Sequence, residues 1–444
     1  MKKNNGISRS KGATSFIDLW AIVYLALVYS LTLLFEQSNI IVFALYFVFA
    51  MPFFAYLDKF VCVCFVLSTM SYYFLGADEG IWSIYTILVI MILLQLIINK
   101  KETINLKSCL TLFWLIAAII MSYSRSEWGY SMGMFAMIYN IAITVFVITT
   151  VKIKKDTIVS FLPKITAFQL LSYVGMLLIN GHYDGYGFSV SKEINHNTFG
   201  TSVAILSVII LVKIIFFKRN SFAYTLIWLL SIALIVLSGS RNALLATILS
   251  SLAIYMVSQK HRGRVISGWM KFLTALFAIV FLLGLVLPEF GIDLSRYNYV
   301  ELFTTGGSNR TIIWETLSPL IWNNYKWFGY GPGHFCSEKM IISIMNLEYK
   351  HTHNTIFEAW GELGIFGLIP FLLILFFALK KGRLHIKNES AYALFGFVLF
   401  EFLLLGLGES FFANIELWLI IGLLLGGKKT FHENEKTEIN DDEE

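Results

Sequence analysis

Long apolar runs follow one another along most of the 444 residues, and they limit the possible folds more than any other feature. Many reach about 20 residues, the length an α-helix needs to cross a bilayer. They lack the alternation of apolar and polar residues typical of membrane β-barrels. The composition agrees, because only 14% of the residues are charged, against about 25% in soluble proteins. Backbone polar groups in lipid must be satisfied within the protein, so these runs predict bundled helices.

The sequence therefore predicts an all-α, polytopic membrane bundle of about 12–14 spanning helices with one long extracytoplasmic loop. The apolar runs lie at residues 16–34, 39–57, 60–76, 81–99, 109–123, 130–151, 157–179, 198–217, 222–238, 241–257, 269–288, 355–379, 391–408 and 411–427. We divide the chain into an N-terminal tail (1–15), a transmembrane bundle (16–288), the long loop (289–354), C-terminal transmembrane helices (355–427) and an acidic tail (428–444).

The positive charges give the expected orientation. With the N-terminus inside, most of the 34 Lys and Arg residues fall in alternate loops on the cytoplasmic side, as the positive-inside rule requires. Both termini are then cytoplasmic. The loops at 180–197 and 289–354 lie outside and contain most of the eight histidines. Long ordered loops usually have a function, so we expect the chemistry there.

The cysteines predict no disulfide framework. Cys62, Cys64 and Cys109 lie in apolar runs as small buried hydrophobes, and Cys336 stands alone in a loop. We find no phosphate-binding loop, dinucleotide fingerprint or zinc signature, and His351 and His353 are too close for the usual zinc spacing on a helix. We expect neither a metal nor a cofactor.

Two arginines are candidate anion ligands. Arg241 follows Ser238, Gly239 and Ser240 between apolar runs, where a guanidinium is costly without a nearby anion. The alternative is an arginine that snorkels to the outer headgroups. Arg310 follows a Gly-rich turn and falls in the first turn of an expected amphipathic helix, whose N-terminus favours anions. The alternative interpretation of Arg310 is an ordinary cation on the surface of the helix.

His351, His353 and Asn354 end the long loop. A neutral imidazole can take a proton from an attacking hydroxyl near neutral pH, and Glu358, about one helical turn further on, is placed to orient it. The alternative is that the histidines are interfacial polar caps. Together, two arginines and a histidine on one face of the membrane can bind a diphosphate and deprotonate a nucleophile.

The stretch HNTIFEAWGELGIFG resembles the C-terminal signature of the O-antigen ligase and O-antigen polymerase superfamily of bacterial polysaccharide enzymes. The signature is His-Asn, nine residues, Gly, two residues, Gly, which here are His353, Asn354, Gly364 and Gly367. Further likenesses are the Ser-Arg element (Ser240, Arg241), a loop arginine with an aromatic-acid pair (Arg310, Trp314, Glu315), a Gly-Tyr-Gly turn (Gly329–Gly331) and an Asn-rich entry to a span (Asn195–Gly200). Some members have a third glycine where this chain has Pro370.

The resemblance implies a metal-independent, inverting glycosyltransferase of the bacterial cytoplasmic membrane. Its donor would be an undecaprenyl diphosphate-linked oligosaccharide and its acceptor a saccharide. Membrane lipid and a chain-length regulator would be further partners, with no role for nucleic acid. By position, Arg241 and Arg310 would hold the donor diphosphate and His353 would be the general base. We also expect His351, Asn354 and Tyr330 to contact the substrate.

Three functions remain open. We favour a polymerase that joins repeat units into O-antigen or capsular polysaccharide, because Pro370 departs from the ligase pattern. The second is a ligase that passes finished chains to lipid A-core or another acceptor. The third is a transporter of the same lipid, for which charge within the membrane is scarce: the main candidates are Lys164, Glu401 and Glu416.

Overall fold

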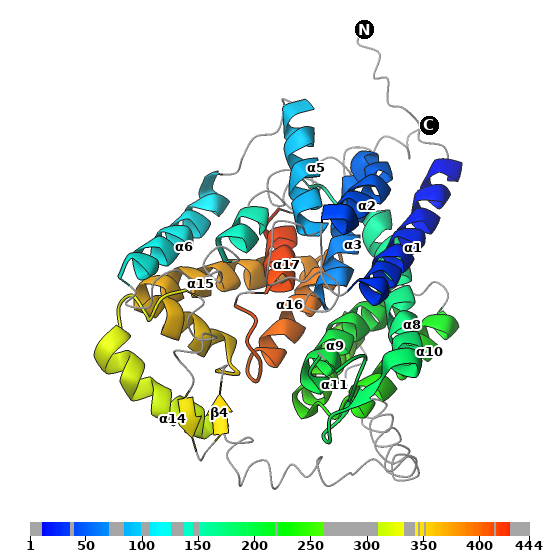
Figure 1. Cartoon of the computed structure of the whole chain (residues 1–444). Coiled ribbons are helices and arrows are strands. Elements are labelled where there is room, and N and C mark those ends of the chain that lie inside the picture. The colour runs from blue at the N-terminus through cyan, green and yellow to red at the C-terminus, as the bar shows by residue number, and fades with distance from the viewer. Residues whose placement is uncertain are drawn as a thin grey trace.

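The computed structural model describes residues 11–35, 40–70, 84–98, 106–125, 137–144, 151–192, 194–217, 221–261, 310–332, 342–344, 347–349, 352–412 and 414–426. These residues form a bundle of helices with two short antiparallel strand pairs (Figure 1). The helices are α1 (Lys11–Leu34), α2 (Ile40–Ala50), α3 (Leu57–Ser68), α5 (Ile84–Ile98), α6 (Leu106–Arg125), α8 (Leu162–Asn180), α9 (His196–Val212), α10 (Ser221–Leu237), α11 (Arg241–His261), α14 (Arg310–Leu320), α15 (Thr355–Lys387), α16 (Ala393–Leu405) and α17 (Ile415–Gly426). The strands are β1 (His182–Tyr183), paired with β2 (Phe188–Ser189), and β3 (Ile342–Ile344), paired with β4 (Leu347–Tyr349).

The expected fold class is confirmed: the protein is a polytopic helical membrane protein. Six helical segments of the described residues are long and apolar enough to cross a membrane: Ser15–Leu34, Ile40–Ser68, Thr157–Asn180, His196–Phe217, Arg241–Lys260 and Thr355–Lys387. Shorter apolar helices lie at Ile84–Gln95, Leu110–Arg125, Phe222–Leu237, Ala393–Leu405 and Ile415–Gly426. The run expected at 269–288 lies outside the described residues, as do most of the long loop, the 428–444 tail and Cys336.

The runs expected at 39–57 and 60–76 are joined into one helical segment through a 3-10 turn between α2 and α3 (Met51–Tyr56). The segment bends sharply where Tyr56 leaves the helical region (φ −135°, ψ 49°). The rings of Phe53 and Phe60 stack 5.3 Å apart, whereas residues seven apart in a straight helix are separated by about 10 Å.

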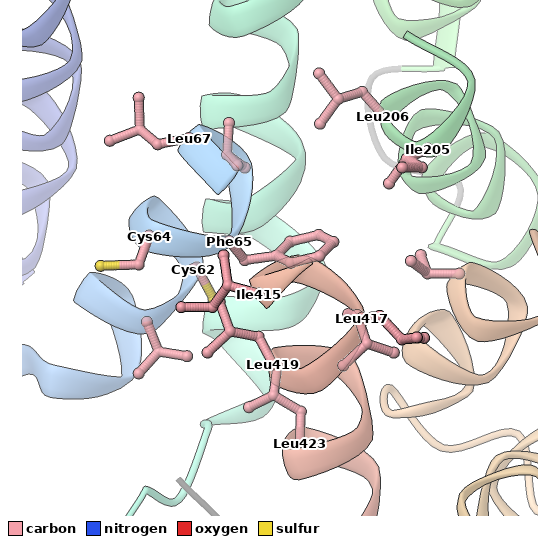
Figure 2. Close-up of a cluster of buried hydrophobic side chains, with 14 of the residues drawn as sticks. Cys62, Cys64, Phe65, Leu67, Ile205, Leu206, Ile415, Leu417, Leu419 and Leu423 are labelled. Carbon is pink, nitrogen blue, oxygen red and sulfur yellow. The ribbon is translucent and has the colours of Figure 1, made fainter. Parts of the chain in front are cut away.

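The helices α16 and α17, orange and red in Figure 1, lie in the middle of the bundle. Helix α16 packs against α9, α11, α15 and α17. Helix α17 also packs against α3, and Figure 2 shows the shared apolar cluster, with Phe65 of α3 beside Ile415 and Leu417 of α17. Cys62 and Cys64 are free thiols buried in this region, as predicted.

The bundle has two distinct polar ends. At one end, Lys59 of α3 and Lys164 of α8 both pair with Asp18 of α1, at 2.5 and 3.0 Å. At the other end, which we call the site end, α9, α11, α15 and α17 begin and α10 and α16 end. All the arginine and histidine positions singled out in the sequence and described by the structure lie on segments at the site end.

Candidate functional site

Asn354 begins helix α15 as its N-cap. Its side-chain oxygen accepts hydrogen bonds from the backbone N–H groups of Ile356 (3.0 Å) and Phe357 (2.9 Å), which is a preferred use of asparagine. Its Nδ2 donates to the carbonyl of Leu407 at 3.5 Å. The amide that we expected to contact substrate is therefore engaged with the protein itself.

His353, directly before this cap, has a φ of +51°. Residues other than glycine seldom adopt this left-handed conformation, and such strained residues cluster at functional sites. Its side chain is 30% exposed, so the imidazole is sheltered but reachable. His351, its expected partner, lies outside the described residues.

Arg310 and His353 meet at a third residue that the sequence reading missed. Nη2 of Arg310 lies 3.4 Å from Oε1 of Glu409, and Nδ1 of His353 lies 3.7 Å from Oε2 of the same carboxylate. Glu409 follows α16 in the loop that leads to α17. Glu358, the expected orienting carboxylate, instead accepts a hydrogen bond from the backbone N–H of Phe412. The carboxylate that the structure places beside His353 is therefore Glu409.

The loop that contains Glu409 is tied to the first turn of α15. The N–H of Thr355 donates to the carbonyl of Gly406 at 2.9 Å. The Thr355 hydroxyl donates to the carbonyl of Glu409 at 3.0 Å and accepts from the N–H of Phe411 at 2.9 Å. These bonds fix the backbone of Glu409 relative to His353.

Arg241 is the first residue of α11 and is half-buried, at the same end of the bundle. Its neighbour Asn242 donates to the carbonyl of Leu405 at 2.9 Å, in the segment that leads to Glu409. Beside this bond, the absence of a side chain at Gly408 allows Arg310 and Asn242 to approach its backbone. A Cβ there would lie only 2.6 Å from Nη1 of Arg310 and 2.8 Å from Cγ of Asn242. The start of α11 and the start of α14 therefore flank the same loop.

The glycines of the expected signature have a structural explanation. Helix α15 is broken at Gly364 (φ +62°, ψ −166°), and the Gly-Tyr-Gly turn at Gly329–Gly331 packs into the break. A Cβ on Gly364 would overlap the backbone of Trp327 and Phe328, and one on Gly329, which also has a positive φ, would overlap the carbonyl of Glu362. Four backbone hydrogen bonds join the two segments: Tyr330 N to Gly361 O (2.9 Å), Gly331 N to Glu362 O (3.1 Å), Ile365 N to Lys326 O (2.8 Å) and Phe366 N to Trp327 O (3.1 Å).

The Tyr330 side chain lies in a small core under the site. It is 1% exposed and packs with Ile313 and Leu317 of α14 and with Ile321, which follows that helix. Burial raises the pKa of Tyr330, and nearby Tyr325 raises it further. The ring that we expected to contact substrate thus supports α14 from within.

Trp314 links α14 to the residues before His353. Its indole N–H donates to the carbonyl of Thr352 at 2.8 Å. Arg310 and His353 are therefore connected on two sides, through Glu409 and through the helix that begins at Arg310. Among the described residues, no group of three or more His, Cys, Asp and Glu side chains is placed to hold a metal ion.

Comparison with known families supports the resemblance seen in the sequence. Residues 225–372 match the family model described as O-antigen ligase. The matched segment contains Arg241, Arg310 and His353 but ends before Glu409. A search of curated proteins finds no match. This match over residues 225–372 supports the resemblance to the O-antigen ligase and polymerase superfamily.

Proposed function

We propose that this protein is a membrane glycosyltransferase that polymerises oligosaccharide repeat units carried on undecaprenyl diphosphate, at the outer face of the bacterial cytoplasmic membrane. The family match supports an O-antigen ligase or polymerase type of membrane enzyme. The observation on which the proposal depends is that Arg310 and His353 lie against the two oxygens of Glu409. This arrangement places a guanidinium and an imidazole at one site, although 43 positions separate them in the chain.

In the proposed reaction, Arg241 and Arg310 bind the donor diphosphate. Guanidinium groups match phosphate oxygens with two parallel N–H donors. Negative charge grows on the diphosphate as its bond to the anomeric carbon breaks, and preorganised cations stabilise that charge. The diphosphate leaves with the lipid attached.

His353 is the proposed general base. Nδ1 lies toward Glu409, so we assign the acceptor proton to Nε2. The acceptor hydroxyl oxygen attacks the anomeric carbon from the face opposite the diphosphate, its proton passes to Nε2, and the sugar configuration inverts. Glu409 is a positioning residue, because a carboxylate beside one imidazole nitrogen favours the tautomer that carries the proton there, and the other nitrogen can then act as the base. The 3.7 Å separation is longer than a hydrogen bond, as is common before substrate binds. The proposed step needs no metal.

The second candidate is a ligase that transfers finished chains to lipid A-core or another acceptor. The description of the matched family favours it. Both reactions use the same donor chemistry, so the acceptor alone distinguishes them.

Reconstitution tests the proposal. We would place the purified full chain in liposomes with one defined lipid-linked repeat unit and separate the products by length. A ladder of lengthened lipid-linked chains, absent with His353→Ala, supports the polymerase. Transfer that occurs only after lipid A-core or another acceptor is added identifies a ligase. No transfer under either condition contradicts a glycosyltransferase.

The transporter alternative needs a separate measurement on the same liposomes. Movement of the labelled lipid between leaflets would be measured with the wild type and with His353→Ala. A transporter would move lipid across the bilayer, and a glycosyltransferase would not need to.

A further inference from the structure

A hairpin outside the matched family segment packs directly against the turn before Arg241. Strands β1 and β2 pair with His182 opposite Ser189 and Tyr183 opposite Phe188. The connection is closed by a backbone hydrogen bond from Asp184 N to Gly187 O (3.2 Å). The tip of the hairpin is therefore a short, defined loop.

The Asp184 carboxylate holds this tip and joins it to helix α9. Oδ1 accepts hydrogen bonds from the N–H groups of Tyr186 (2.9 Å) and Gly187 (3.0 Å). Oδ2 lies 2.5 Å from Nδ1 of His196, the first residue of α9. His196 is 4% exposed. A buried imidazole needs a polar partner, and Asp184 of the hairpin is such a partner.

The tip of the hairpin and helix α9 contact the turn at Ser238–Ser240 from two sides. Gly187 lies so close that a Cβ there would overlap the carbonyl oxygen of Ser238. A Cβ on Gly200, in the second turn of α9, would overlap the side chains of Ser238 and Ser240, at 2.4 and 2.6 Å. Gly239 has a φ of +65° and faces the carbonyl of Tyr186. The next residue is Arg241, so the contacts fix the backbone from which its side chain extends.

We infer that Asp184 and His196 form a positioning pair that holds the turn before Arg241 and so sets the affinity for the donor diphosphate. The inference rests on the proposed role of Arg241 as a diphosphate ligand. A guanidinium binds two phosphate oxygens only when its plane is correctly placed. The pair acts through the Ser238–Ser240 turn and does not itself touch substrate.

Two kinds of variant test the pair, one chemical and one steric. His196→Ala and Asp184→Ala remove the hydrogen bond between the two side chains. Asp184→Asn keeps hydrogen-bonding groups at the position of the carboxylate and removes its charge. Gly187→Ala keeps the side chains of Asp184 and His196 and pushes a methyl group into the Ser238 carbonyl. Gly175→Ala in α8 is the matched control, because a Cβ there meets nothing within 4 Å.

We expect the KM for lipid-linked donor to rise about tenfold in His196→Ala, Asp184→Ala and Gly187→Ala, the effect of losing roughly one good hydrogen bond to an ion. The KM for acceptor should stay unchanged. Asp184→Asn should stay within about threefold of the wild type, because its amide keeps the geometry. Gly175→Ala should match the wild type. A merely structural role would lower the amount of active protein and leave the donor KM unchanged.

Arg241→Lys separates the inference from the function on which it rests. If Arg241→Lys leaves the donor KM unchanged, the proposed diphosphate role of Arg241 is wrong. If Arg241→Lys raises it while Gly187→Ala and His196→Ala do not, the positioning pair is wrong and the proposed function stands. If both effects occur, the double variant Arg241→Lys/Gly187→Ala should raise the donor KM by less than the product of the two single increases. The reason is that the free-energy effects of residues that act through one another do not add. Independent effects would contradict the inference.

Discussion

Arg310 and His353 lie on opposite oxygens of one carboxylate, at 3.4 and 3.7 Å from Glu409. The three residues come from the start of α14, the residue before the α15 cap and the loop between α16 and α17. Their side chains are between 19% and 30% exposed. A site of this kind is partly shielded from water, so its charges interact more strongly than they would on an open surface.

Glu409→Gln should lower kcat roughly 10- to 100-fold, in line with the loss of one hydrogen bond to a charged group. The amide keeps the size of the side chain and removes the negative charge that orients the imidazole. Donor KM should change little or fall, because Arg310 loses an anionic competitor. Steady-state kinetics in liposomes would measure both constants. A variant with unchanged kcat would remove Glu409 from the mechanism.

His353→Ala should slow transfer about 100- to 10,000-fold, the usual contribution of a general base. The helix start should survive, because Asn354 makes the cap through its own side chain. Protein level and thermal unfolding in detergent would serve as controls. Substantial residual activity at normal protein level would assign the base elsewhere.

Arg241→Lys should be severely impaired in donor binding even though the charge is kept. A single ammonium cannot reproduce the two parallel N–H donors of a guanidinium. Binding of a non-transferable lipid diphosphate would report the loss directly. If lysine substituted fully, the guanidinium would be acting only as a general positive charge near the headgroups.

The bundle could be predicted from the sequence, since segment length and apolar content follow from the thickness of the bilayer. The positions of Arg310 at a helix start and of Arg241 after a turn also followed from local residue types. Glu409 could not be found in this way. It stands in the short stretch GLGES between two apolar runs, and only the packing of α16 against α15 and α11 brings it to the site.

The reason for the glycines of the signature could not be predicted from the sequence either. Gly329, Gly364 and Gly367 matched a family pattern, but spacing alone gives no reason for them. Contact between segments more than 30 residues apart explains the first two, because each backbone occupies the place of the other's side chain. Contact of Tyr330 and Asn354 with substrate stays a prediction; in the structure Tyr330 is buried in a small core and Asn354 caps α15.

Gly364→Ala should destabilise the protein by about 1–3 kcal/mol from backbone strain alone. The overlap with Trp327 and Phe328 adds to this cost. The apparent melting temperature in detergent would measure it, with Gly175→Ala as the control. An unchanged melting temperature would contradict a break in α15 at Gly364.

The Asp184 and His196 pair predicts how stability depends on pH. Partial desolvation opposes ionisation of Asp184, but the hydrogen bonds from His196, Tyr186 and Gly187 outweigh it and lower the pKa of this carboxyl below its ordinary value of 3.8. A carboxyl whose pKa is lowered by folding stabilises the folded state above the unfolded pKa and loses that effect as the pH falls through the folded pKa. The wild type should therefore melt at a higher temperature than Asp184→Asn at pH 7, and the difference should shrink below a pH of about 3.8. Thermal unfolding of both proteins in detergent at pH 7 and pH 3 would measure it. A difference that stayed constant or grew at pH 3 would mean that the charge of Asp184 does not hold the hairpin.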